Sequence, residues 1–254
     1  MKKLIALILA LFKRKPAPDP VPGPSPIIPV IFHPSEAGYK LKTYFDFVKN
    51  RFHWGEWTHT YPGNQIKKGV CINDENCVIQ KPDGLHLLAE MGDTDDTNNV
   101  GMIATHQFLE ILYGYIEVTA KVPAGGFLYW FSIWMYNKRG WQPEIDIIEC
   151  MGPDAKSVCM THHWVGPDGK DVSEGYNLPT VDLSLDFHRY GIEWTPTRLT
   201  WYLDGVAKYS TQNQIPQVPL FLICNMQSRE YTHVYTPGEV PAEAVIQKIE
   251  IWNK

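Results

Sequence analysis

Short runs of alternating or continuous apolar residues, separated by turn residues, extend from about residue 35 to the end of the chain. No segment shows a convincing helical period, whereas period-two alternation with many β-branched and aromatic residues is typical of strands. Asp-Gly pairs at 83–84 and 204–205 separate such runs and predict tight hairpins. We therefore expect strands at 44–48, 77–80, 85–89, 113–122, 127–136, 143–150, 157–164, 188–194, 198–203, 206–210, 220–225 and 245–252.

A dozen antiparallel strands in one domain predict an all-β fold, a two-sheet sandwich. Sandwiches of this length occur as single domains, so we assign residues 35–254 to one domain. With twenty Pro, nineteen Gly, nine Trp and thirteen Tyr, the composition favours short strands, turns and an aromatic-lined surface over helical bundles.

The first 34 residues follow a different pattern. Three residues with two lysines precede nine apolar residues at 4–12, as in the charged and apolar regions of a secretory signal, and nine are too few to span a membrane. A basic run at 13–15 stands where a cleavage site would be, so residues 1–15 are expected to be either a signal or an anchor. Residues 16–34 contain eight prolines and predict an extended linker. We expect a secreted or cell-surface protein, with membrane contact only if the first segment stays uncleaved.

The strand at 143–150 (P-E-I-D-I-I-E-C) contains three acids among isoleucines. In a regular strand Glu144 and Asp146 share one face, while Glu149 falls on the apolar face. An unpaired carboxylate there would cost several kcal/mol by order of magnitude. The pattern therefore predicts either a misassigned strand or a β-bulge between Asp146 and Glu149 that returns Glu149 to the acidic face. Taken alone, the segment also fits a strand whose acids face water.

The preceding strand is aromatic on the face that would adjoin these acids. Trp130 and Trp134 share one face with Ser132, while apolar residues at 131, 133 and 135 share the other. One face then meets the core and the other lines a groove, where indole rings stack well on sugar rings. For each tryptophan alone, core packing is the competing interpretation.

The net charge argues against nucleic-acid binding, and the cysteine content limits which disulfides can form. A net charge of −5 provides no basic footprint for nucleic acid. The odd number of cysteines, five, leaves at least one free. Cys71 and Cys77 could form a disulfide in an exported protein, whereas Cys150 and Cys224 are expected to be buried free thiols.

Several motifs, in order, resemble glycoside hydrolase family 16, the jelly-roll β-glucanases and galactanases. They are Y-G-Y-I-E at 113–117, the aromatic run 130–134, E-I-D-I-I-E at 144–149 with Gly152 after it, D-F-H-R-Y-G-I-E-W-T-P at 186–196 and Y-L-D-G at 202–205. The likeness covers about residues 39–254, and the bulged E-x-D-x-x-E spacing is that of the laminarinase-like branch.

The resemblance implies a concanavalin A-like jelly roll with an open cleft and a retaining endo-glycosidase acting on β-linked polysaccharide. Glu144 takes the place of the nucleophile, Glu149 that of the acid/base, and Asp146 lies between them. Crowding of three carboxylates should keep one protonated near neutrality. No cofactor is implied, the partner is the polysaccharide alone, and we expect a monomer.

Substrate contacts are expected from Trp130, Trp134, Trp141, His163 and Asn225. Whether His162 or His163 faces the cleft depends on the strand register. Among the remaining motif residues, His188, Glu193 and Trp194 are expected to hold strands together.

Three departures from the family pattern concern Pro143, the run after Asn225 and Gln247. Pro143 replaces the usual Gly before the nucleophile. The run N-M-Q-S-R-E at 225–230 does not continue to G-G and Trp, which puts a β-1,3-glucan preference in doubt, and Arg229 could meet a sulfated or acidic sugar. Gln247 stands where the family often has a calcium-binding Asp, so we expect no metal.

The expected substrate is β-1,3- or mixed β-1,3/1,4-glucan. The alternatives are a galactanase acting on agar, porphyran or carrageenan, a non-catalytic carbohydrate-binding sandwich, and a structural module on a proline-rich stem. A transglycosylase of the same fold is disfavoured, because those members usually have the unbulged E-x-D-x-E spacing.

Overall fold

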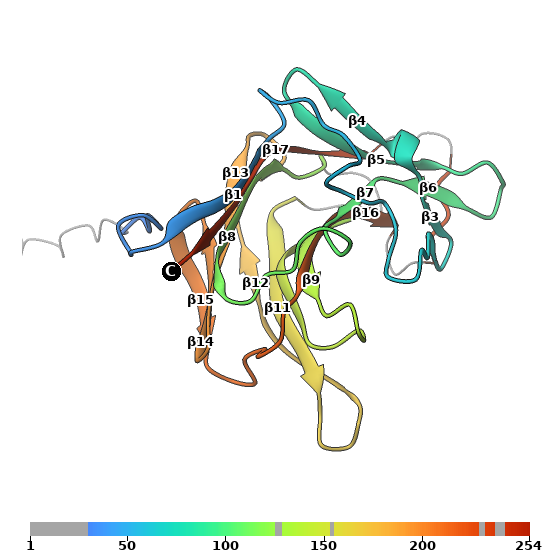
Figure 1. Cartoon of the computed structure of the whole chain (residues 1–254). Helices are drawn as coiled ribbons and strands as arrows, with labels where there is room; N and C mark the ends of the chain where they lie inside the picture. The colour runs from blue at the N-terminus through green and yellow to red at the C-terminus, as the bar shows by residue number, and fades with distance from the viewer. Residues whose placement is uncertain (1–29, 125–128, 153–154, 229–231, 237–241) are drawn as a thin grey trace, which may run out of the picture.

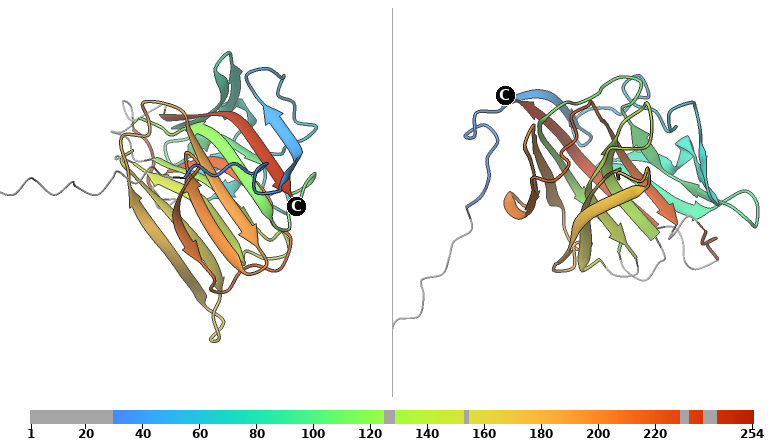
Figure 2. Two further views of the ribbon diagram at one scale, coloured as in Figure 1. Left: turned by 90° about the vertical axis from the view of Figure 1, so that its left-hand side faces the viewer. Right: turned by 90° about the horizontal axis from the view of Figure 1, so that it is seen from below.

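The strands of the protein form two sheets that pack face to face, as the views in Figure 1 and Figure 2 show. The computed structural model describes residues 30–124, 129–152, 155–228, 232–236 and 242–254. In these ranges the single helical element is the 3-10 turn η1 (Glu75–Cys77), and none of their helical segments has the length and apolarity needed to cross a membrane. The predicted all-β, two-sheet class is confirmed.

The larger sheet has eleven strands around the long C-terminal strand β17. One edge of β17 pairs with β8, and the other edge pairs with β1 and then β5. The main path runs β15-β14-β13-β8-β17-β5-β6-β3-β2, with β4 paired to β5. The bounds are β1 Lys40–Asp46, β2 Lys67–Lys68, β3 Cys71–Asn73, β4 Val78–Lys81, β5 Gly84–Met91, β6 Asn98–Val100, β8 Gly114–Lys121, β13 His188–Thr195, β14 Arg198–Leu203, β15 Val206–Thr211 and β17 Ala242–Asn253.

The smaller sheet has six strands in the order β12-β11-β10-β9-β16-β7. The acidic strand is β10, and it is hydrogen-bonded on both sides, to β9 and β11. The bounds are β7 Met102–Ala104, β9 Tyr129–Tyr136, β10 Glu144–Met151, β11 Ser157–Val165, β12 Asp171–Pro179 and β16 Phe221–Ser228.

Each expected strand has a counterpart, although the first begins at Lys40, four residues earlier than predicted. Both Asp-Gly hairpins are present, closed by the pairs Lys81 with Gly84 and Leu203 with Val206. The sequence missed β2, β3, β6, β7 and β12. It also predicted only antiparallel pairing, whereas β3 and β6 pair in parallel.

The core between the sheets consists of the inward apolar faces of both sheets, including the buried rings of Trp194, Trp201 and Tyr190. All five cysteines are free, so the disulfide considered for Cys71 and Cys77 does not form. Cys71 Sγ instead lies 3.0 Å from Ser228 Oγ, and Cys77 Sγ donates to Glu90 at 3.5 Å. Cys150 and Cys224 are buried thiols, as expected.

The predicted signal or anchor segment 1–15 lies outside the described residues, as does residue range 16–29 of the predicted linker. The last residues before position 35 already contact the sandwich. The Phe32 amide donates to the Gly205 carbonyl at 2.7 Å, and the Phe32 ring lies 4.9 Å and 4.7 Å from the rings of Tyr115 and Tyr202.

Candidate active site

The predicted β-bulge is present in β10. Asp146 lies opposite Trp134 of β9, but Ile148 lies opposite the next residue, Ile133, so the register shifts by one residue at Ile147. Because the bulge interrupts the pairing of β10 with β9, the Asp146 carbonyl can accept a 2.8 Å hydrogen bond from Trp201 Nε1 of the larger sheet. This bond satisfies a backbone group that the bulge would otherwise leave buried and unpaired.

The bulge places the apolar side chains of β10 on one face of the strand and its acidic side chains on the other. Its apolar residues, Ile145, Ile147, Ile148 and Cys150, lie in the core cluster. Its carboxylates line a cavity of about 330 Å³ on the opposite side of the smaller sheet. The other side chains of this cavity are Lys68, Trp130, Ser132, Trp134, Trp141, Met151 and His163.

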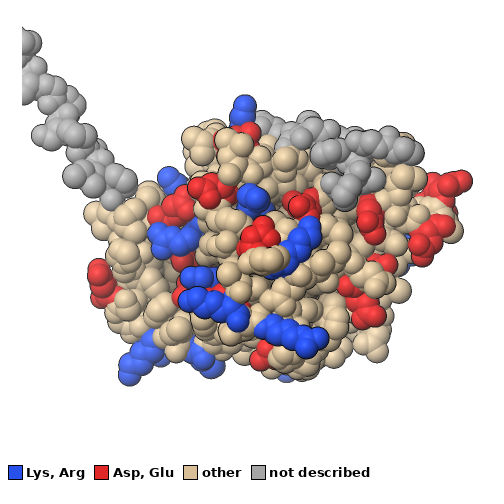
Figure 3. Space-filling model, turned by 90° about the horizontal axis from the view of Figure 1, so that it is seen from above, with Lys and Arg blue, Asp and Glu red and all other residues tan. Residues whose placement is uncertain are grey.

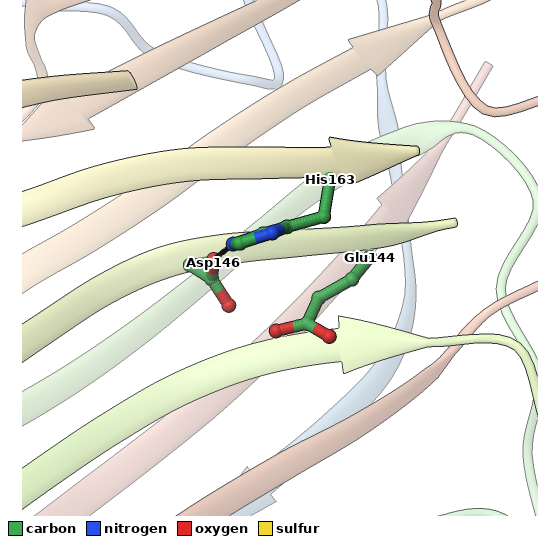
Figure 4. Close-up of side chains that lie close together, drawn as sticks. All are labelled: Glu144, Asp146 and His163. Atoms are coloured by element: carbon green, nitrogen blue, oxygen red, sulfur yellow. Dashed lines mark ion pairs between the residues drawn. The ribbon is translucent and has the colours of Figure 1, made fainter. Parts of the chain in front are cut away.

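Glu144, Asp146 and His163 point toward one another in this cavity (Figure 4), with polar atoms all within 4.8 Å. Register places His163 of β11 opposite Glu144. His163 Nε2 lies 3.4 Å from Asp146 Oδ2, and Nδ1 lies 3.2 Å from Asp171 Oδ1 on β12. In the described part of the chain this is the one trio of His, Cys, Asp and Glu side chains close enough to hold a metal ion.

Two indole donors hold the outer carboxylates. Trp141 Nε1, from the loop before β10, donates to Glu144 Oε2. Trp130 Nε1, from β9, donates to Glu149 Oε1 at 3.0 Å. Each donor fixes the orientation of one carboxylate and stabilises its charged form.

The three carboxyl groups share raised pKa values, chiefly because they are buried. Burial, reinforced by the charge and hydrogen bond of Asp146, raises the pKa of Glu144 to about 9. Burial and then the charge of Glu149 raise the pKa of Asp146 well above its usual range. Burial also raises the pKa of Glu149, opposed by His163, the Trp130 hydrogen bond and Lys68. The pKa values of all three carboxyls are therefore shifted upward mainly by burial, and the charge of a neighbouring acid adds to the shift for Glu144 and Asp146.

A second cavity, of about 680 Å³, adjoins the first and shares Lys68, Trp134 and Trp141 with it. Its floor contains Trp134 and Tyr136, whose rings stack with centroids 5.0 Å apart and planes 13° from parallel. The two cavities together form a cleft along the outer face of the smaller sheet.

The structure brings most of the predicted binding residues into this cleft. Trp130, Trp134, Trp141 and His163 line it, whereas His162 is fully buried on the other face of β11. Asn225 is only 2% exposed and lines neither cavity, because its Oδ1 accepts a 2.8 Å hydrogen bond from Trp134 Nε1. It orients Trp134 in place of the predicted groove-facing contact. Arg229 lies outside the described residues.

Sequence reasoning missed Lys68, Tyr136 and Asp171. Lys68 belongs to the two-residue strand β2, too short for any periodic signal, yet its ammonium lies 5.6 Å from the Trp134 ring centroid. Asp171 begins β12, an edge strand without apolar alternation. Tyr136 shares the parity of Trp134 and could have been found from it.

Comparison with known proteins places this cleft in a family. The profile described as "Glycosyl hydrolases family 16" matches residues 67–238, more than half of the chain and all three carboxylates. The chain belongs to glycosyl hydrolase family 16. The family likeness drawn from the motifs is thereby confirmed.

Relatives of this family 16 chain include one named a β-glycanase and one named a glucan β-glucosidase. The chain is 30% identical over 143 residues to "Endo-1,3-1,4-beta-glycanase ExsH" of Rhizobium meliloti, covering 55% of this chain and 30% of the relative. It is 37% identical over 110 residues to "Glucan endo-1,3-beta-glucosidase" of Cryptopygus antarcticus, covering 40% of each. The matched segments therefore span less than half of these relatives.

A solved structure supports the fold of this family 16 chain. The laminarinase catalytic domain of Thermotoga maritima superposes with a TM-score of 0.72 over 85% of this chain and 98% of that domain, at 22% identity. At this identity the likeness concerns the fold alone.

Proposed function

We propose that the protein is a retaining endo-glycoside hydrolase that cleaves β-1,3- or mixed β-1,3/1,4-linked glucan by double displacement. The observation that carries the proposal is the bulge at Ile147, which places Glu144 and Glu149 on one face of β10 in an aromatic cleft. Family membership supports it, as do the names of two distant relatives, an endo-1,3-1,4-β-glycanase and a glucan endo-1,3-β-glucosidase. A non-catalytic binding sandwich would need neither the bulge nor the buried acids.

In the first step, the Glu144 carboxylate attacks the anomeric carbon and forms a glycosyl ester. Glu149 donates its proton to the glycosidic oxygen as the carbon–oxygen bond breaks, so the leaving sugar departs as an alcohol. The raised pKa of Glu149 suits it to carry that proton.

In the second step, Glu149, now a carboxylate, takes a proton from water, and the water oxygen attacks the anomeric carbon. The ester bond breaks and returns Glu144 as a carboxylate. Two inversions at one carbon leave the β configuration unchanged in the product.

Asp146 accepts the proton that burial retains on Glu144. Glu144 has a pKa raised to about 9, so it must lose its proton before it can attack. Asp146 is its hydrogen-bonded neighbour and takes that proton, while His163 holds the Asp146 carboxylate from the other side at 3.4 Å. Trp141 then stabilises the ionised Glu144.

Substitution of the two glutamates tests these roles. We expect Glu144→Gln to abolish release of reducing ends from laminarin and from mixed-linkage glucan, without unfolding the protein. We expect Glu149→Gln to lower kcat by about 10²–10⁴-fold. Glu36→Gln, at an exposed position outside the cleft, is the matched control and should keep full activity.

The stereochemistry of the first product is the second readout. Proton NMR at early times should show the β anomer before mutarotation. Full activity in Glu144→Gln would overturn the assignment of the nucleophile, and an initial α anomer would overturn the double displacement.

A further inference from the structure

The second cavity of the cleft is basic, in a chain whose net charge is −5. Four of its lining residues are Lys67, Lys68, Lys138 and Arg139, and none is Asp or Glu. On the face shown in Figure 3, by contrast, Lys and Arg side chains lie among Asp and Glu side chains. The one-sided charge of the cavity therefore departs from the mixed pattern of that surface.

Two of these four cations are available to a ligand. Lys138 forms an ion pair with Glu110 at 2.6 Å, and Lys68 faces the catalytic carboxylates, whose charges act on it. Lys67 and Arg139 are exposed, and neither forms an ion pair with a carboxylate of the described residues. They lie on the rim of the cavity, from β2 and from the loop that follows β9.

This cavity lies on the nucleophile side of the cleft. It is lined by Trp141, the donor to Glu144, and not by Trp130, the donor to Glu149. The nucleophile attacks the sugar on the glycone side, whereas the acid protonates the oxygen that leads to the aglycone. The stacked rings of Trp134 and Tyr136 provide the apolar floor on which sugar rings of the glycone can lie.

We propose that the glycone half of the cleft selects a polysaccharide that carries anionic substituents, recognised by Lys67 and Arg139. The shared chemistry is an oxygen anion, either a carboxylate or a sulfate ester, on a sugar held against Trp134 and Tyr136. Arg139 offers a planar guanidinium that can donate two hydrogen bonds to such a group, and Lys67 offers a point charge beside it. The proposal rests on the proposed function, because it assigns the substrate of the same cleft.

The experiment compares three forms of one β-1,3-glucan of equal length: unsubstituted, carboxymethylated and sulfated. The variant Lys67→Gln/Arg139→Gln is compared with the wild-type protein. The matched control, Lys42→Gln/Lys208→Gln, removes the same charge from exposed positions of β1 and β15 outside both cavities. The readouts are kcat/KM for each polymer and, independently of turnover, retardation in native gels that contain each polymer.

We expect the wild-type protein to prefer at least one anionic polymer, and the Lys67/Arg139 variant to lose about tenfold or more of that preference, mainly through KM. The loss of activity on the unsubstituted polymer, which carries no anion for these two cations, should be smaller than the loss on the anionic polymer. The preference should fall as salt rises from about 0.05 to 0.5 M, because exposed charges are screened over that range. Whether the carboxymethylated or the sulfated polymer shows the loss identifies the anion.

The inference would be overturned if the wild-type protein showed no preference for an anionic polymer, or if both double variants kept that preference equally. In either case, cleavage of the unsubstituted polymer would still support the proposed function. If no polymer is cleaved, the proposed hydrolysis fails, and the gels decide the inference alone. Retardation by an anionic polymer that depends on Lys67 and Arg139 would uphold it, and equal mobility in all gels would overturn it.

Discussion

Lys68 is a positively charged residue of the cleft that changes the pKa values of two of its acids. Its ammonium lies over the rings of Trp134 and Tyr61, 5.6 Å and 5.9 Å from their centroids. Burial lowers the pKa of Lys68, and the negative charges of the three carboxyls oppose that effect. Acting in the other direction, its positive charge lowers the pKa of both Asp146 and Glu149. A residue of the two-residue strand β2 thus affects the protonation of the acids on β10.

Replacing Lys68 should therefore move the pH optimum. In Lys68→Met the carboxylate of Glu149 loses a stabilising charge, so its pKa rises and Glu149 keeps its proton to higher pH. We expect the alkaline limb of kcat/KM on unsubstituted β-glucan to move to higher pH by roughly half a unit or more. Lys208→Met, on β15, is the control and should leave the profile in place. A limb that stays fixed, or moves to lower pH, would show that Lys68 does not act on the acid.

Strand β10 shows how far the sequence predicts an element. Because an unpaired carboxylate in the core is so unfavourable, the parity conflict of Glu149 with Glu144 and Asp146 left two interpretations, a misassigned strand or a bulge. The structure has the bulge. Burial also determined which face of β9 meets the core. Where each side of a strand meets a distinct environment, the pattern of residues carries that information.

The elements missed by the sequence lack such a pattern. Strand β12 has one edge free and alternates between exposed and half-exposed residues, so no apolar period marks it. Strands β2, β3, β6 and β7 have only two or three residues each, which is too short to show a pattern of alternation. Lys68 and Asp171 lie on two of these strands, and long-range pairing alone brings them to the carboxylates. The sequence therefore named cleft-lining side chains of β9, β10 and β11, and it missed Lys68 and Asp171 on the strands that show no pattern.

Deleting Ile147 would test the bulge as an element. Without the extra residue, Glu144, Asp146 and Glu149 would alternate with Ile145 and Ile148 in a regular strand, so Glu149 would stay on the cleft face but one residue nearer to Glu144 along the chain. The deletion also removes the buried Ile147 side chain, so we expect it to lower the free energy of unfolding in urea by about 2–5 kcal/mol. Hydrolysis should fall without being abolished, because the carboxylates keep their face and only their spacing changes. Ile147→Val keeps the residue count and removes one buried methylene, so it should cost about 1 kcal/mol and retain activity. Loss of all hydrolysis in a deletion variant that still folds would rule out this account of the bulge.

On the scale of the whole molecule, the cleft opposes folding at neutral pH. The sandwich buries Glu144, Asp146 and much of Glu149 close together, and their raised pKa values mean that burial disfavours their charged forms. The rest of the core compensates for this unfavourable term. The same burial raises the pKa of Glu149, which the proposed mechanism needs for its general acid, so the burial that favours the proposed activity lowers the stability of the fold.

The conflict predicts a pH dependence of stability with a definite sign. Glu144 has a folded pKa of about 9, above its usual 4.5, so between these values the folded state binds more protons than the unfolded state. The free energy of unfolding therefore falls as pH rises through that window, by up to about 1.4 kcal/mol per pH unit for one such group. In Glu144→Gln this group no longer titrates, so its share of the pH dependence is lost. We expect urea unfolding to show a small difference between variant and wild type at pH 4.5 and a clear stabilisation of the variant at pH 8. A difference that stays constant with pH would mean that Glu144 is charged in the folded protein, and that the proton resides on Asp146 already before substrate binds.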